Sequence, residues 1–348
     1  MTRKIRTTRH YPSGSGATER KGVLHAGYRS AHGARLAALL RPRALSTRTP
    51  QGALPRAFRR PRIVLLGCGD VGLRFLNAFG SRLRVFGVVR RAEALQDIRQ
   101  AGGVPLCIDL DDRSACRRLR GLAPRVLHSA PPPTQGLDDA RTRHAQAALP
   151  EAQRWVYLST TGVYGDCAGA WVDETRTVAP HNDRAIRRVA AEQRLRKQAA
   201  RGGTQVVVLR VPGIYARERL PLERLQRGTP ALRLQDDGYT NHIHADDLAR
   251  IAFTALWRGG ASRVIHAVDD SDLKMGDYFD AVADAFGLSR PPRLPREALK
   301  AAVSPMLWSF MSESRRLTNR RLKRELRVRL RYPQVSTLLA QVKTGASA

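Results

Sequence analysis

The chain has 348 residues, of which 42% are hydrophobic and 26% are charged, a composition typical of a folded protein with a substantial core. No run approaches the roughly 20 consecutive apolar residues that cross a bilayer, so we expect no membrane-spanning segment. The four cysteines show neither CxxC nor Cys/His spacing. This argues against a disulfide framework or a zinc site, and it predicts free thiols, no metal centre and a cytoplasmic location.

The net charge of +31 is the unusual feature of the composition, and residues 1–60 contribute 14 Lys/Arg against one acid, Glu19. This segment has no lasting periodicity beyond the brief helical patch "ARLAALL", so we expect a disordered, dispensable tail. An organellar transit peptide and a misassigned upstream start are alternative interpretations. Nucleic-acid binding is another reading of the charge. Because no nucleic-acid module is recognisable, we favour a solvated arginine-rich surface and expect no nucleic-acid partner.

The pattern changes at "RIVLLGCGDVGLRFLNAF" (62–79), where an apolar strand, a glycine turn and an amphipathic helix follow one another. Three glycines give the spacing G-x-G-x-x-G in the context that dinucleotide-binding folds require. The first permits a tight turn, the second lets backbone approach a pyrophosphate, and the third lets helix pack on strand. The helix N-terminus then faces the phosphates. The predicted dinucleotide loop comprises Gly67, Gly69, Asp70, Val71 and Gly72.

The next predicted strand, 83–89, ends in Arg90 and Arg91. NAD-binding folds place an acid at about this distance from the glycines to hold the ribose 2′-hydroxyl. Two guanidinium groups are suited instead to a 2′-phosphate. The sequence therefore favours NADP(H), with NAD(H) left open, and the alternative is a pair of solvated arginines.

Strand and helix patterns then alternate along the chain. Helical patterns at 92–102 and 114–122 lie between strand patterns at 104–112, 125–133 and 154–166. Such alternation predicts an α/β fold with a doubly wound, Rossmann-like parallel sheet, in which ligands bind beyond the carboxyl ends of the strands.

The second half continues with a strand at 204–216 and a basic helix and turn at 217–232. Arg217, Arg219 and Arg224 could meet an anionic substrate such as a nucleotide-sugar diphosphate, or could simply be surface charge. Apolar residues at i, i+3, i+4 and i+7 predict an amphipathic helix over 275–286. We therefore divide the chain into a tail (1–60), a dinucleotide-binding domain (61–210) and a smaller C-terminal α/β lobe (211–348) interleaved with the core.

From about residue 61 onward the chain resembles the extended short-chain dehydrogenase/reductases, the NAD-dependent epimerase/dehydratase family, and within it an atypical bacterial subgroup. The motifs that carry the resemblance are "GCGDVG" (67–72), "DLDD" (109–112), "HSAPPP" (128–133), "LSTTGVYGD" (158–166), "LRVPGIYA" (209–216), "NHIHADDLARI" (241–251) and "HAVDDSDLKMGDYFDAVA" (266–283). They span most of the fold in the expected order, and they are specific to the family rather than to a substrate.

The resemblance implies roles for several residues. Asp109 and Leu110 would border the adenine, and Ser129 and Ala130 would line the cofactor groove. Thr160 falls where the family places a hydroxyl that binds the reacting oxygen of the substrate, although a local backbone cap is an equally good interpretation. The segment 312–333 resembles the family's C-terminal helix and closing segment, in which 312–316 would border the substrate cleft. The structural alternative is a final docking helix.

The resemblance fails at "HNDRAIRRVAAEQ" (181–193), where the family has its catalytic tyrosine and lysine. Anchoring on Glu192 places Arg184 at the tyrosine position and Arg188 at the lysine position. An arginine cannot relay protons because it stays protonated at any working pH, and losing general acid–base help typically costs about 10² to 10⁴ in rate. Arg188 could still hold the nicotinamide ribose. The candidates for a replacement acid are Tyr164, Tyr215, His242 and His244.

These observations predict an NAD(P)-binding, short-chain dehydrogenase-like protein. The leading hypothesis is an NADP(H)-dependent oxidoreductase or epimerase/dehydratase acting on a small or nucleotide-linked substrate, with Thr160, Tyr164 and Arg188 at the catalytic site. The alternative is a non-catalytic NADP(H) sensor, which the missing Tyr/Lys pair favours. We expect a small-molecule substrate and no membrane partner, and a homodimer stays open.

Overall fold

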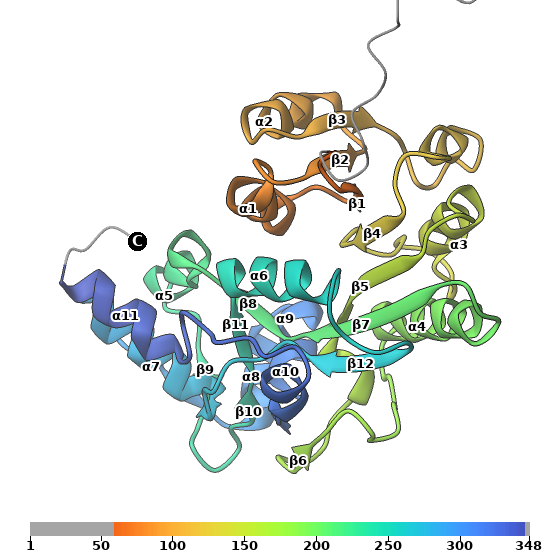
Figure 1. Cartoon of the computed structure of the whole chain (residues 1–348). Helices are drawn as coiled ribbons and strands as arrows, with labels where there is room; N and C mark the ends of the chain where they lie inside the picture. Colours follow the sequence, from red (N-terminus) through yellow and green to blue (C-terminus); the bar gives the residue numbers. More distant parts are fainter. Residues whose placement is uncertain (1–58, 345–348) are drawn as a thin grey trace, which may run out of the picture. The chain divides into compact units, whose positions relative to one another are not determined.

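The computed structural model describes residues 59–344 (Figure 1). The predicted disordered tail (1–60), except for its last two residues, lies outside the described residues, and so does the "ARLAALL" patch. Within the described part, no helix is long and apolar enough to cross a membrane.

A seven-stranded parallel sheet forms the centre of the described region (Figure 1). Its strands lie in the order β12-β7-β5-β4-β1-β2-β3, and every neighbouring pair is parallel. The order reverses between β1 and β4, as in doubly wound dinucleotide-binding sheets. The predicted fold class is therefore confirmed. The strands are β1 (Arg62–Leu66), β2 (Arg84–Val89), β3 (Val104–Cys107), β4 (Arg125–His128), β5 (Arg154–Thr160), β7 (Gln205–Val211) and β12 (Arg263–His266).

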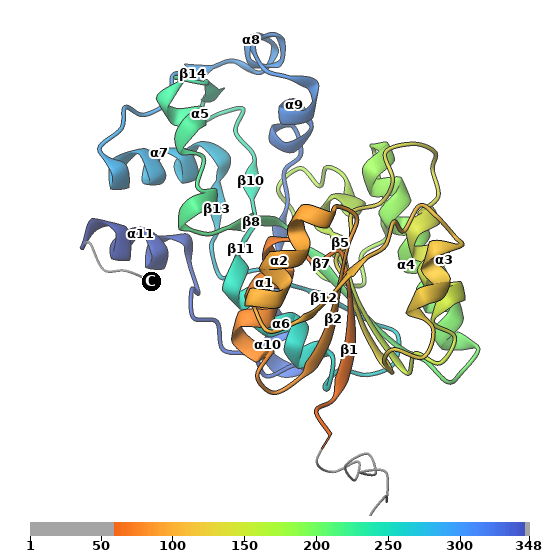
Figure 2. The ribbon, with the colours of Figure 1, turned by 90° about the horizontal axis from the view of Figure 1, so that it is seen from above.

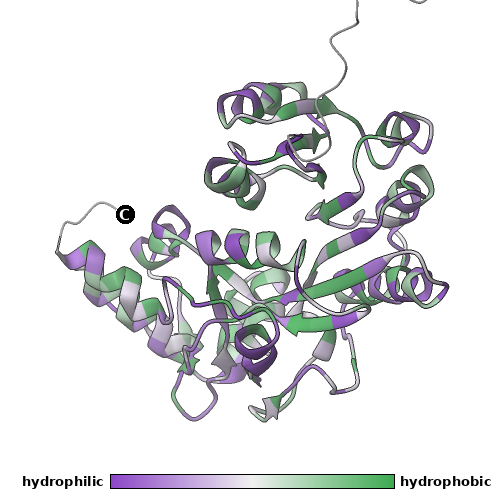
Figure 3. Cartoon of the chain, in the orientation of Figure 1, coloured by the Kyte–Doolittle hydropathy of each residue, from purple (hydrophilic) through white to green (hydrophobic). Residues whose placement is uncertain are grey.

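Helices cover both faces of this sheet, as Figure 2 shows. On one face lie α1 (Asp70–Phe79) and α6 (Ala245–Ala255), and on the other lie α3 (Ala140–Ala148) and α4 (Asp183–Ala200). Strand residues alternate between the two faces, so Ile63 packs in the first core and Val64 in the second. Because both faces are buried, the middle residues of the strands are apolar, as Figure 3 shows for β7.

The C-terminal lobe has a hydrophobic core of its own. The amphipathic helix predicted at 275–286 is α7 (Met275–Phe286), and it buries Tyr278, Phe279 and Val282 there. Further elements of the lobe are α5 (Leu222–Gln226), β9 (Ala231–Leu232), β14 (Arg293–Leu294), α8 (Arg296–Ala302), α9 (Pro305–Met311) and α11 (Val335–Lys343). The chain also returns from this lobe to the main sheet through α6 and β12.

The remaining elements are short and connect these layers. They are η2 (Ala92–Ala94), α2 (Leu95–Gln100), η3 (Ala115–Leu119), η4 (Thr161–Tyr164), β6 (Trp171–Val172), β8 (Gly213–Tyr215), η5 (Arg217–Arg219), β10 (Tyr239–Thr240), β11 (His242–His244), β13 (Leu273–Lys274), β15 (Arg316–Leu317) and α10 (Arg320–Arg324).

Three predicted helices are shorter than the sequence patterns indicated. The segment 114–122 forms only the 3₁₀ turn η3. In 217–232, Pro221, Gly228 and Pro230 limit the helix to α5, because proline and glycine interrupt helical hydrogen bonding. The predicted C-terminal helix at 312–333 is reduced to α10, and the helix that docks on the lobe is α11.

Candidate functional site

A different structural feature explains why glycine occupies each of the three positions in the loop between β1 and α1. Gly67 has φ +81°, and a Cβ there would lie 2.5 Å from backbone atoms of Ala130. A Cβ at Gly72 would lie 3.1 Å from Leu65, so this glycine sets the close packing of α1 on β1. A Cβ at Gly69 would meet no atom within 4 Å. The space in front of Gly69 is therefore open to a ligand, as a pyrophosphate at the N-terminus of α1 requires.

Ser129, predicted to line the cofactor groove, also fixes the shape of this loop. Its hydroxyl donates to the backbone carbonyls of Leu66 at 3.1 Å and Gly67 at 2.8 Å. The backbone N–H of Ala130 donates to Leu66 O at 2.9 Å. The end of β4 is thus tied to the glycine loop, and Ser129 lines the adjoining cleft while Ala130 is buried behind it.

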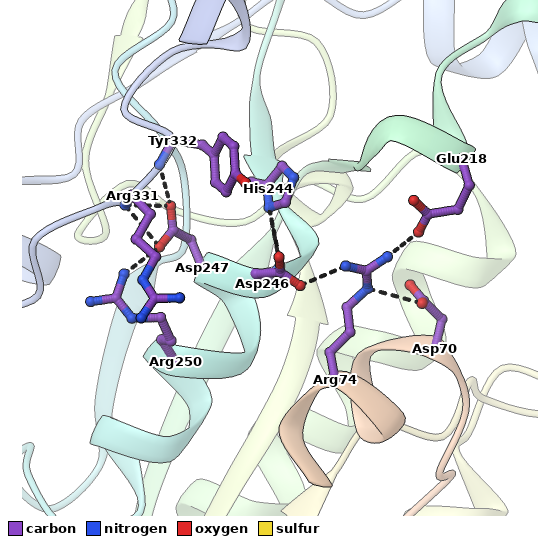
Figure 4. Close-up of polar contacts among 9 residues, drawn as sticks. All are labelled: Asp70, Arg74, Glu218, His244, Asp246, Asp247, Arg250, Arg331 and Tyr332. Carbon is purple, nitrogen blue, oxygen red and sulfur yellow. Dashed lines mark hydrogen bonds and ion pairs between the residues drawn. The ribbon is translucent and has the colours of Figure 1, made fainter. Parts of the chain in front are cut away.

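Asp70, in the first turn of α1, belongs to an ion-pair network that connects the glycine loop with the C-terminal lobe (Figure 4). Arg74 pairs with Asp70 at 3.0 Å, with Asp246 at 2.5 Å, and with Glu218. Arg219 pairs with the second oxygen of Asp70 at 2.7 Å. Burial alone would raise the pKa of Asp70, but the hydrogen bonds from Arg219 and Arg74 outweigh it and hold the pKa below its usual value. The negative charge beside the expected phosphate site is therefore neutralised by two arginines.

A cleft of about 930 Å³ extends from this loop towards the C-terminal lobe. Its lining includes Gly69 at one end, Thr160 and Arg188 along the carboxyl ends of the strands, and Tyr215 and Phe310 towards the lobe. This volume is in the range of cofactor and substrate sites. Residues far apart in the sequence thus meet at the edge of the sheet where such folds bind ligands.

Thr160 lies at the end of β5 and lines the cleft. Its hydroxyl oxygen accepts a hydrogen bond from the backbone N–H of Gly162 at 3.2 Å, so it caps the turn η4. The two interpretations of Thr160 are compatible, because a hydroxyl that accepts this bond can still donate its own proton to a ligand.

Arg188, at the lysine position, reaches the cleft from α4 although its side chain is buried. Its Nη1 donates to Leu158 O at 2.8 Å, to the hydroxyl of Tyr157 at 3.1 Å and to Ala130 O at 3.4 Å. Its Nε is buried and has no hydrogen-bond partner among the described residues. An unsatisfied buried donor is costly, and an acceptor on a bound ligand would relieve that cost.

Arg184, predicted at the tyrosine position, lines the same cleft one helical turn earlier. Asn182 caps α4 by accepting the backbone N–H of Ala185 at 2.9 Å, which fixes the direction in which this first turn enters the cleft. Partial burial and the nearby positive charge of Arg188 lower the pKa of Arg184. The two arginines are therefore neighbours, as the anchoring on Glu192 implied.

The structure does not bring Tyr164 to the cleft, which corrects its predicted catalytic role. Tyr164 is buried in the core, and its hydroxyl contacts His266 Nε2 at 2.6 Å and accepts from Arg210 Nη1 at 2.7 Å. Arg210 also forms a buried ion pair with Glu192 at 2.7 Å. Burial raises the pKa of Tyr164 to about 12. A tyrosine held in such a network positions strands and helices rather than exchanging protons with a ligand.

Of the other candidate acids, Tyr215 and His242 line the cleft and His244 does not. His244 caps α6 by accepting the backbone N–H of Asp246 at 3.2 Å and stacks on Tyr332 with ring centroids 3.6 Å apart. Burial lowers the pKa of His242 to about 4, so this side chain is neutral at neutral pH. Its Nδ1 is buried and has no hydrogen-bond partner within residues 59–344. Burial also raises the pKa of Tyr215.

The predicted adenine and 2′-phosphate residues lie beside the cleft rather than in its lining. Arg90 and Arg91 directly follow β2, and neither side chain has an ion-pair or hydrogen-bond partner among residues 59–344. Asp109 is half-buried after β3, where its carboxylate accepts the backbone N–H of Asp111 at 2.9 Å. Leu110 is buried beside it.

The basic segment 217–232 does not supply the anion site that its sequence suggested. Arg224 is turned into the lobe, where its guanidinium lies 4.1 Å from the centre of the Phe279 ring and donates to Pro230 O at 3.1 Å. Burial lowers its pKa to about 10. Arg219 lines the cleft but is engaged by Asp70, and Arg217 is exposed outside the cleft lining.

The sequence patterns did not predict that α9 contributes to the lining of the cleft. Met306 and Phe310 line the cleft although they are 74% and 53% exposed. Pro305 is typical of a helix start, and the four-residue spacing of Met306 and Phe310 places them on one face of that helix. This spacing was the available sequence signal. The expectation that 312–316 border the cleft is met by Glu313 and Arg315.

A family model gives an independent finding. Residues 140–266, from α3 to β12, match the model described as the NAD dependent epimerase/dehydratase family. This part of the chain is therefore similar to an NAD-dependent epimerase/dehydratase domain. The resemblance inferred from the sequence motifs is thereby confirmed, and the glycine loop that precedes the matched residues has the structure that such a domain requires.

Solved structures support the same fold. A conserved protein of unknown function from Silicibacter pomeroyi is 29% identical, covers 83% of this chain and all of its own, and has a TM-score of 0.69. The UDP-glucose 4-epimerase of Thermotoga maritima, solved with UDP-glucose, is 15% identical with a TM-score of 0.66, covering 81% of this chain and 97% of that one. The UDP-glucose 4-epimerase of Thermus thermophilus, solved with NAD, is 19% identical with a TM-score of 0.65, covering 82% and 100%. No curated protein sequence matches the chain.

The residues present fit a nicotinamide dinucleotide. Gly69 leaves open space at the N-terminus of α1, and Arg188 presents an unpartnered buried Nε further along the cleft. The family match and this geometry support nicotinamide cofactor binding at the carboxyl edge of the sheet.

Proposed function

We propose that the epimerase/dehydratase domain uses NADP(H) in an oxidoreductase or epimerase-type reaction on a small substrate. The observation that carries the proposal is the single cleft in which the glycine loop, Thr160 and Arg188 meet. The cofactor, when bound, supplies or accepts a hydride. In this reaction Thr160 orients the reacting oxygen through its free hydroxyl proton, and Arg188 holds the nicotinamide ribose through its unpartnered Nε.

The preference for NADP(H) rests on Arg90 and Arg91. Their guanidinium groups form no hydrogen bond or close ion pair within the described region, although Arg90 lies near enough to Asp111 to help lower the pKa of that carboxyl. They are therefore available to a 2′-phosphate without breaking an existing ion pair. We expect wild-type protein to bind NADPH at least about tenfold more tightly than NADH, since a charge-assisted hydrogen bond contributes roughly 1.5 to 3 kcal/mol. Calorimetric titration with both reduced cofactors and both oxidised forms measures this ratio.

The matched variants are Arg90→Asp, which should reverse the preference, and Arg99→Asp, an exposed arginine on α2, which should leave it unchanged. Equal affinities for NADH and NADPH in the wild type would disprove the NADP(H) preference. Binding of neither cofactor would disprove the whole proposal.

The proton relay has to differ from that of the family, because Arg184 occupies the tyrosine position and Tyr164 is enclosed in the core. Tyr215 and His242 are the two candidate acids that remain in the cleft. We propose that one of them moves the proton. Once a substrate is found, Tyr215→Phe and His242→Gln should separate the two, and turnover that survives both changes would refute the proposal.

The second candidate function is an NADP(H) sensor without turnover. The two arginines at the Tyr/Lys positions favour it, because they retain cofactor contacts while removing the usual acid. A sensor would bind NADPH and show no oxidation of it with any member of a carbonyl-compound panel, whereas an enzyme would show substrate-dependent loss of NADPH absorbance.

The expected setting of either function is the cytoplasm, because all four cysteines are free thiols, the form that reducing compartments maintain. A small-molecule substrate is the proposed partner.

A further inference from the structure

The first two turns of α4 place two positive charges on one wall of the cleft. Arg184 and Arg188 are four residues apart, so they lie on the same helix face, and both line the cleft. In the part of the chain that the structure describes, neither guanidinium has a carboxylate within ion-pair distance, and Arg184 has no hydrogen bond either.

Two neighbouring positive charges of this kind destabilise the protein when no anion is bound. Like charges at i and i+4 repel on a helix, and Arg188 is additionally removed from water. Most of the chain's other cleft-lining charges are compensated. Arg219 pairs with Asp70, and Arg315 pairs with Glu313 at 2.6 Å.

One acid of the cleft remains, and it does not neutralise the pair. Asp183 lines the cleft directly before Arg184, but its carboxylate forms no ion pair with either arginine within residues 59–344. As the first residue of α4, Asp183 instead carries the charge that a helix N-terminus prefers. The two guanidinium groups therefore remain available to an anion.

An apolar surface shares the cleft with this cation pair. Met306 and Phe310 project from α9 into the lining while remaining largely exposed. Exposed large apolar side chains gathered at a cleft mark a ligand surface more often than scattered ones do. Met275 of α7 lines the cleft as well.

We propose that the substrate is a small amphiphilic anion, whose carboxylate or phosphate is bound by Arg184 beside the positive charge of Arg188 and whose apolar part lies against Met306 and Phe310. This inference deepens the proposed function, and it rests on that function because it names the bound anion as the substrate. It places an anion where the family has its catalytic tyrosine, so the charged group lies beside the reacting centre rather than at the far end of the cleft.

The test uses 4-phenylbutanoate and its uncharged amide as probes, titrated calorimetrically into the full chain at fixed ionic strength, with and without NADP⁺. We expect the carboxylate to bind at least about tenfold more tightly than the amide, because hydrogen bonds to a charged group are stronger than neutral ones. Arg184→Gln should bring this ratio close to one, and Arg184→Lys should retain part of it.

The matched control is Arg196→Gln, an exposed arginine further along the same helix and outside the cleft, which should keep the wild-type ratio. A wild-type ratio near one, a ratio unaffected by Arg184→Gln, or no binding of 4-phenylbutanoate would each overturn the inference. Carboxylate selectivity that persists while no dinucleotide binds would instead refute the proposed function and leave the anion site in place. The two failures are therefore distinguishable.

Discussion

Asp247 on α6 should be among the most sensitive positions for stability, although it lies outside the cleft lining. Its side chain is fully buried, and it accepts hydrogen bonds from three donors (Figure 4). These are the backbone N–H of Arg331 at 2.8 Å, the backbone N–H of Tyr332 at 2.8 Å and Nη1 of Arg250 at 2.7 Å. The carboxylate thus fastens the segment that leads into α11 against the main sheet.

The perturbation that tests this is Asp247→Asn, which keeps the size of the side chain. It removes the charge and replaces one acceptor oxygen by an NH₂ group facing backbone donors. Hydrogen bonds to charged groups contribute about 1.5 to 3 kcal/mol, and breaking a buried ion pair costs about 3 to 5 kcal/mol. We therefore expect the free energy of unfolding to fall by roughly 3 kcal/mol. For a folded region of this length the unfolding midpoint would drop by roughly 5 °C.

Thermal unfolding followed by circular dichroism measures this change. The matched control is Asp284→Asn, which removes an exposed carboxylate paired with Arg290 at 2.7 Å. Because exposed ion pairs contribute little, its midpoint should move by no more than about 1 °C. Equal midpoints for the two variants would refute the reasoning that the three donors make Asp247 a structural anchor.

Three further predictions concern the cleft and the core. Gly69→Ala should leave the unfolding midpoint unchanged, because the new Cβ meets no atom within 4 Å. It should weaken NADPH binding at least about tenfold, because the methyl group occupies the space of the phosphates. An unchanged affinity for NADPH would count against the site. Tyr164→Phe should lower the free energy of unfolding by about 1 to 3 kcal/mol without changing NADPH affinity, and loss of affinity at normal stability would restore Tyr164 to the site. The pKa of His242 is lowered from 6.5 to about 4, so the unfolded chain binds this proton first and stability is lost as pH falls through that window. Between pH 6.5 and 4.5, the free energy of unfolding of the wild type should fall by about 2 kcal/mol more than that of His242→Gln. Parallel stability profiles would contradict this.

Much of the fold could be predicted from the sequence because the signals are local. A strand buried on both faces has to be apolar throughout, and a glycine turn between such a strand and an amphipathic helix has few alternative structures. The same holds for α7, whose apolar spacing alone predicted its residues 275–286. Where proline, glycine or repeated arginine interrupted the pattern, as in 217–232 and 312–333, the expected helices were wrong in length.

The sequence by itself predicted a dinucleotide-type loop between β1 and α1, and it predicted that Arg184 and Arg188 stand where the family it resembles has tyrosine and lysine. Only the tertiary structure decided which side chains meet. Tyr164 lies 46 residues from Arg210 and 102 from His266, yet their contacts enclose it in the core. Met306 and Phe310 reach the cleft because the C-terminal lobe folds over the edge of the sheet. Periodicity describes which face of an element is buried, whereas the partner that buries it is chosen by packing between distant segments, which no local pattern records.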